Sequence, residues 1–63
     1  MFIPKDSHMN VIVNRFSKDE ALALCNVVKA EHSDWTCQIF AGMGSKFSVE
    51  VYNTDGVFLG HYI

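Results

Sequence analysis

The chain has 63 residues, of which 49% are hydrophobic, and it carries a formal net charge of −2. A domain of this size buries only about 60% of the surface that its unfolded chain exposes, so most of its apolar residues are needed for the core. We therefore expect one domain over residues 1–63. The sequence contains no long insertion that could form a lid and no dense cluster of titratable residues, so we expect no enzyme and no cofactor.

Charge also bears on the class of partner. Nucleic-acid binders usually carry a basic stripe, and here the five cations are scattered along the chain with no two adjacent: Lys5, Arg15, Lys18, Lys29 and Lys46. The acidic residues are too sparse for a mimic of DNA. This pattern disfavours a nucleic-acid partner.

The N-terminal residues do not have the pattern of a secretion signal. Residues 1–10 contain no cationic segment followed by an apolar one, and no run in the chain approaches the roughly 18 apolar residues of a membrane span. The sequence predicts a cytoplasmic protein without a membrane partner.

The first predicted elements are a strand and a helix. Residues 9–16 are rich in β-branched and apolar side chains, which are typical of a strand. Ser17 and Glu20 then form the pattern of a capping box, which predicts that a helix begins here and runs to about residue 31 or 32. Apolar residues follow at helical spacing and predict one buried stripe: Ala21, Leu24, Cys25 and Val28.

Three further strands are predicted over residues 34–41, 46–52 and 57–62, separated by glycine-containing turns. A three-residue loop with Gly56 in the left-handed region would pair Tyr52 with Phe58. In the same register, further pairs would be Val51 with Leu59, Val49 with His61, and Phe47 with Ile63. An odd-numbered loop in the first hairpin would place Ile39 opposite Phe47 and Cys37 opposite Val49.

These registers predict an α+β fold of two layers, in which one helix packs on one face of a mostly antiparallel four-stranded sheet. The strands before and after the helix are expected to run parallel through a right-handed crossover, giving the order βαβββ. The first strand would lie beside either the second or the fourth. The residues expected to face the helix share one parity: Trp35, Cys37, Ile39, Phe47, Val49, Val51, Leu59, His61 and Ile63.

The opposite parity collects aromatic side chains on a face that no second helix covers: Phe40, Tyr52, Phe58 and Tyr62. Aromatic residues concentrate at the centres of protein interfaces, so we predict that these four residues bind a partner. Two alternatives are a cross-strand pair that only stiffens the hairpin, and a platform for stacking bases.

The cysteines and histidines are interpreted as structural. Cys25 and Cys37 both face the predicted core, where a disulfide is geometrically possible, but the expected reducing compartment predicts free, buried thiols. Burial also argues against a cysteine nucleophile. His32 and His61 do not form a close metal-binding pair with either cysteine, so no metal site is predicted. We expect His61 at the margin of the core, with a ring nitrogen bonded to backbone.

The function predicted from these features is a small non-enzymatic module that binds a larger protein through the aromatic face or an unpaired strand edge. Such a module could inhibit its partner, as small proteins of phages and mobile elements do. A first alternative is a homo-oligomer with a structural or small-ligand-binding role. A second is a weak single-stranded nucleic-acid binder. Fold analogy alone does not choose among them.

Overall fold

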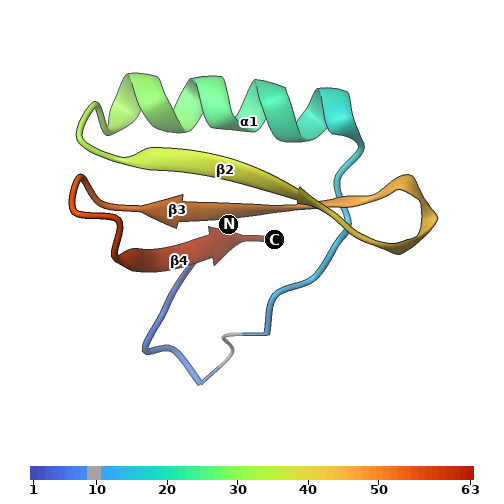
Figure 1. Cartoon of the computed structure of the whole chain (residues 1–63), viewed down its shortest axis with the longest axis horizontal. Coiled ribbons are helices and arrows are strands. Elements are labelled where there is room, and N and C mark those ends of the chain that lie inside the picture. The colour runs from blue at the N-terminus through green and yellow to red at the C-terminus, as the bar shows by residue number, and fades with distance from the viewer. Residues whose placement is uncertain (9–10) are drawn as a thin grey trace.

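The computed structural model describes residues 1–8 and 11–63 (Figure 1). Its elements are β1 (Phe2–Pro4), α1 (Lys18–Glu31), β2 (Thr36–Ala41), a short 3-10 helix η1 (Met43–Ser45), β3 (Phe47–Tyr52) and β4 (Phe58–Tyr62). The strands form one four-stranded sheet in the order β1-β4-β3-β2, and every neighbouring pair is antiparallel. The helix packs against β2 and β3, which confirms the predicted α+β fold.

The first strand was predicted in the wrong place. Of residues 11–16, only Phe16 joins the sheet, through an isolated bridge to Phe47, and residues 9 and 10 of the predicted strand lie outside the described residues. The first strand is instead β1, which occupies the outer side of β4, one of the two predicted neighbours. Its pairing with β4 is antiparallel, so the strands before and after α1 do not run parallel as predicted. Phe16 instead bonds to Phe47, at the end of β3 that β4 leaves unpaired.

The helix begins as predicted. The Ser17 hydroxyl accepts a hydrogen bond from the Glu20 amide at 3.2 Å, and the Ser17 amide donates to the Glu20 carboxylate at 3.0 Å. This capping box satisfies two backbone donors that the first helical turn would otherwise leave unpaired. The backbone hydrogen bond from Ser17 is the main reason that the pKa of Glu20 is lowered.

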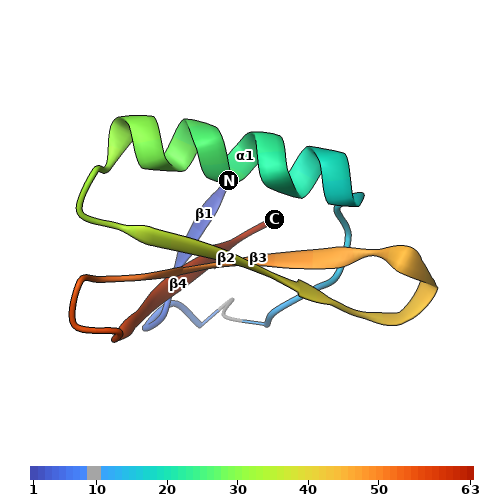
Figure 2. The same cartoon turned by 45° about the horizontal axis from the view of Figure 1, so that its top comes forward.

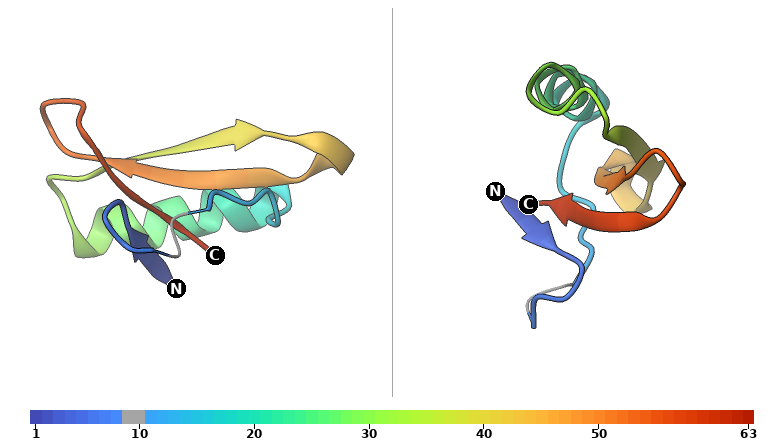
Figure 3. Two further views of the ribbon diagram at one scale, coloured as in Figure 1. Left: turned by 90° about the horizontal axis from the view of Figure 1, so that it is seen from below. Right: turned by 90° about the vertical axis from the view of Figure 1, so that its left-hand side faces the viewer.

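Most of the core lies between α1 and the sheet face that it covers, which we call the helix face (Figure 2). Ala21 and Val28 from the helix and Val49 and Val51 from β3 are buried there. The other side of the sheet, which we call the far face, is approached by the chain that follows β1. Figure 3 shows how β1 and β4 turn away from the direction of β2 and β3.

A disulfide joins Cys25 on α1 to Cys37 on β2. The prediction of reduced thiols is therefore wrong, although both cysteines do face the same core. The helix stripe and the helix face of β2 bring the two Cα atoms to 5.5 Å, which is within the range that a disulfide bridges. The bond ties the helix to the outermost strand of the sheet.

The first hairpin differs from the predicted register by two residues. Ile39 lies opposite Val49, and Cys37 lies opposite Val51. The turn lies one residue later than expected: η1 forms it, with Gly44 and Ser45 both at positive φ, and the Gly42 amide closes it by bonding to the Lys46 carbonyl. A shift of two residues keeps every side chain on its predicted face, because side chains alternate with a period of two.

The second hairpin begins as predicted and then departs. Gly56 is left-handed at φ 80°, and Tyr52 lies opposite Phe58. A β-bulge follows, so that Gly60 rather than Leu59 lies opposite Val51. A side chain at Gly60 would collide with the Ile3 carbonyl and the Phe2 ring, so the glycine is what allows β1 to approach.

The bulge exchanges the faces of the residues that follow it. Tyr62 lies opposite Val49 and is therefore on the helix face, whereas His61 lies opposite Glu50 on the far face. Both residues were predicted on the other side of the sheet. The Ile63 amide bonds to the Met1 carbonyl at 3.0 Å, so Ile63 does not pair with Phe47 as predicted.

Candidate functional site

The free edge of β2 is the longest unpaired strand edge in the sheet. In the hairpin, the Gly42 amide bonds to the Lys46 carbonyl at 2.8 Å. Backbone bonding alternates along an antiparallel ladder, so the N–H and C=O groups of alternate β2 residues point away from β3: those of Cys37, Ile39 and Ala41. Phe47, which lies opposite Ala41, shows the same alternation: its N–H and C=O groups point away from β2 and bond to Phe16. We call these outward groups the β2 edge.

The features that usually prevent an edge strand from pairing with another chain are missing from β2. Its six residues include no charge and no proline, and its ladder with β3 runs without a bulge. The opposite edge, β1, has only three residues and ends in Pro4. Within the described part of the chain, no turn or loop bonds through its backbone to the β2 edge. The two edges therefore differ, and only β2 offers a regular ladder to another strand.

Aromatic side chains lie at two places on the far face. Phe40 is opposite Ser48, whereas Tyr52 is opposite Thr36, four residues of strand away or about 13 Å. Phe40 belongs to β2 itself and is 40% exposed. Tyr52 and Phe58 lie further into the sheet, half-buried, with their ring centroids 5.7 Å apart in an edge-to-face arrangement. We call these three residues the aromatic surface. Tyr62, the fourth residue of the predicted site, is not part of it, because the β-bulge turns its ring to the helix face, 5.3 Å from Phe2.

A row of hydrogen bonds along β3 holds Tyr52 in place. The Glu50 carboxylate accepts one bond from the Ser48 hydroxyl at 3.1 Å and another from the Tyr52 hydroxyl at 3.3 Å. Burial raises the pKa of Tyr52, and the neighbouring Glu50 charge raises it further. The Tyr52 hydroxyl thus stays protonated and bonded within the sheet, so this residue presents a ring of fixed orientation.

His61 is a further polar residue of the far face, next to Glu50 and Ile3. It is fully buried, and neither ring nitrogen has a hydrogen-bond partner in the part of the chain that the structure describes. The predicted bond from this ring to backbone is therefore wrong. The β-bulge, which no sequence pattern revealed, is the reason for its position.

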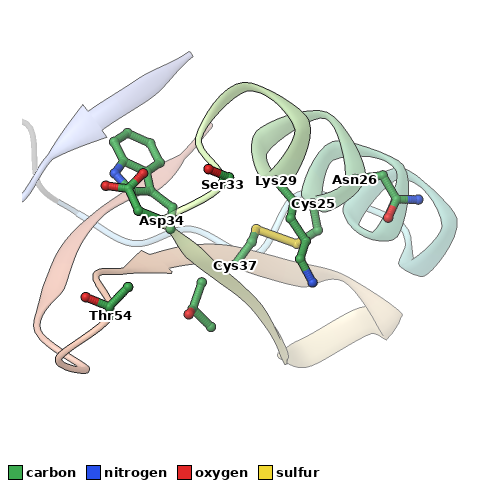
Figure 4. Close-up of a pocket in the computed structure, with 9 residues that line it drawn as sticks. Cys25, Asn26, Lys29, Ser33, Asp34, Cys37 and Thr54 are labelled. Carbon is green, nitrogen blue, oxygen red and sulfur yellow. A yellow bond between two sulfur atoms is a disulfide. The ribbon is translucent and has the colours of Figure 1, made fainter.

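A pocket of about 370 Å³ lies between the end of α1 and the start of β2 (Figure 4). Its wall includes the disulfide and the charged residues Lys29 and Asp34, and its other lining residues are polar or aromatic: Asn26, Ser33, Trp35, Thr36 and Thr54. Sequence reasoning missed this pocket. The sequence held one indication of it: Lys29 lies one helical turn after Cys25, so both residues can line the same pocket. Because both cysteines are oxidised, the pocket contains no thiol nucleophile.

Across residues 1–8 and 11–63, no three His, Cys, Asp or Glu side chains gather closely enough to hold a metal ion. None of the helices in these same ranges has the length and hydropathy required to cross a bilayer.

Comparisons with models of protein families, with curated proteins and with solved structures found no match to this chain. The candidate site therefore rests on its own geometry, namely the β2 edge and the aromatic surface, of which Phe40 belongs to β2 itself.

Proposed function

We propose that this protein is a non-enzymatic interaction module that binds an extended strand of a protein partner along the β2 edge. The observation that carries the proposal is the unprotected backbone ladder of Cys37, Ile39 and Ala41. Strand addition is a common mode of recognition, in which main-chain hydrogen bonds supply affinity and alternate side chains supply specificity.

The aromatic surface supports the same proposal. Phe40 projects from the edge strand onto the far face, so a strand added to β2 would lie directly beside its ring. The ring of Tyr52 is held by Glu50 and by contact with Phe58, so it would lose little conformational freedom on binding. Main-chain pairing and the contact with the Phe40 ring would thus be made by one partner segment.

The cytoplasmic location expected from the sequence stays a prediction, and the disulfide weighs against it, because disulfides are rare in reducing compartments. The intact mass of the protein from its native cells, with thiols blocked during extraction, tests this point. A mass that shows blocked thiols would favour the cytoplasm. An unblocked protein that gains two blocking groups only after reduction would favour an oxidising compartment.

The proposed function is tested with two substitutions at one exposed position. Ala41→Pro removes an outward N–H from the β2 edge without removing a donor to β3, whereas Ala41→Thr keeps the N–H and a strand-forming side chain. Immobilised wild-type protein and Ala41→Thr should retain the same partner from a host lysate, and Ala41→Pro should lose it. Equal retention by all three baits, with Ala41→Pro shown to be folded, would contradict binding at this edge.

A further inference from the structure

We propose that the strand which pairs with the β2 edge is the β2 strand of a second copy of this chain. The two copies would run antiparallel about a twofold axis, with Ile39 of one copy opposite Ile39 of the other. This inference rests on the proposed function and specifies the partner of the same site. The dimer is the form that the protein takes when no other partner occupies the β2 edge.

The hydrogen-bonding pattern of the edge is self-complementary. The outward groups belong to Cys37, Ile39 and Ala41, which are spaced symmetrically about Ile39. An antiparallel twofold centred there makes Ile39 exchange both of its bonds with its own counterpart, and makes Cys37 of each copy exchange bonds with Ala41 of the other. Every outward donor and acceptor of both strands finds a partner, and none is left over.

The charges also favour a second copy. The chain is uncharged throughout residues 36–44, so two β2 edges approach without like-charge repulsion. Asp34 precedes this stretch and Lys46 follows it. In an antiparallel pair, the acidic end of one stretch lies toward the basic end of the other, so opposite charges flank the seam on both sides.

The exposed apolar side chains near the edge would be covered by the same arrangement. On the far face, the register places Phe40 of each copy, 40% exposed in the single chain, opposite Gln38 of the other. On α1, Cys25 points toward β2 and lies about 60° around the helix from the buried Val28 on one side and from Leu22 on the other. Leu22, which is 46% exposed, therefore projects past the β2 edge.

The position of Leu22 along the seam agrees with the twofold axis. Figure 1 shows α1 lying along β2 in the opposite chain direction, so moving from Cys37 to Ile39 corresponds to moving from Cys25 toward the start of the helix. Two residues of strand span about 6.6 Å, which is about four residues of helix. This places Leu22 close to the axis, where it would meet its own counterpart.

The inference is tested by sedimentation and by amide hydrogen exchange on the full chain with its disulfide intact. We expect a mass twice the monomer value of 7.1 kDa, with the amides of Cys37 and Ile39 becoming protected as protein concentration rises. Ala41→Pro should return the protein to a monomer and remove that protection, while Ala41→Thr should behave as wild type. Leu22→Lys should weaken the dimer without changing the monomer's protected amides.

Three results would overturn the inference. The first is a monomer at millimolar concentration whose Cys37 and Ile39 amides exchange freely. The second is a dimer in which these two amides remain unprotected, since such a dimer would use another surface. The third is a dimer that survives in a folded Ala41→Pro variant. If the protein is monomeric but a different partner protects the same amides, the second copy is excluded while the proposed function still stands.

Discussion

Removing the Cys25–Cys37 disulfide should destabilise this protein more than any change at its surface. The bond closes a loop with a sequence separation of 12 residues. In the chain-entropy model, a loop of this length contributes about 3 kcal/mol to the free energy of unfolding, because the cross-link restricts the unfolded chain. Total stability for a domain of this size is roughly 3 to 9 kcal/mol, so the bond would supply a large part of it.

The assay is urea unfolding of the oxidised protein, of the same protein after reduction, and of the double variant Cys25→Ala/Cys37→Ala, followed by the fluorescence of Trp35. With an m-value of about 1 kcal/mol per molar, the midpoint should fall by about 3 M on reduction. The difference between the oxidised and reduced proteins gives the effect of the cross-link, and the difference between the reduced protein and the double variant gives the effect of packing the two thiols. Equal midpoints for the oxidised and reduced proteins would refute this reasoning, as would an intact mass that shows two free thiols before reduction.

Three further predictions follow from other contacts. Gly60→Ala should lower the free energy of unfolding by more than about 1 kcal/mol, because the new Cβ meets the backbone of β1 as well as a ring; an unchanged thermal midpoint would contradict the close approach. Folding lowers the pKa of Glu20 from 4.5, so the Glu20 carboxylate stabilises the fold fully above that pH, and this stabilisation is lost as the pH falls through the folded pKa. The thermal midpoints of Glu20→Gln and wild type should therefore differ near neutral pH and converge in acid. Phe40→Ser should change the free energy of unfolding by less than about 0.5 kcal/mol but weaken partner binding measured by calorimetry. Phe58→Ser should lower the free energy of unfolding by about 1 kcal/mol, because the ring contact with Tyr52 is lost; equal effects of the two variants on stability would contradict this difference.

The parts of the fold that the sequence predicted are those that depend on neighbouring residues. The capping box needs only Ser17 and Glu20, three positions apart, and the structure confirms it. Alternation assigned the side chains of β2 and β3 to the correct faces even though the register of the first hairpin was off by two residues. The α+β class followed from one amphipathic helix and several alternating segments.

The candidate site was predicted only in part, because side-chain alternation assigns faces correctly only up to the β-bulge. Phe40, Tyr52 and Phe58 share the far face because the alternation of side chains is unbroken as far as the Tyr52–Phe58 pair, and the β-bulge comes after Phe58. Tyr62 and His61 follow the bulge, and one inserted residue turned both to the opposite face. No periodic pattern marks that insertion, and β1, which Gly60 allows to approach, is distant in sequence.

The sequence by itself determined the helix, the three later strands and the faces of the central ones, because hydrogen bonding and side-chain alternation act within a few residues. Only the tertiary structure decided which segment completes the sheet, whether Cys25 and Cys37 are bonded, and which edge is left unpaired. Residues 11–13 have strong strand propensity, yet β1 took the place beside β4 and Phe16 took the last free position on β3. The free edge of β2, where the function is proposed, is thus the outcome of a competition among distant segments that local propensity cannot resolve.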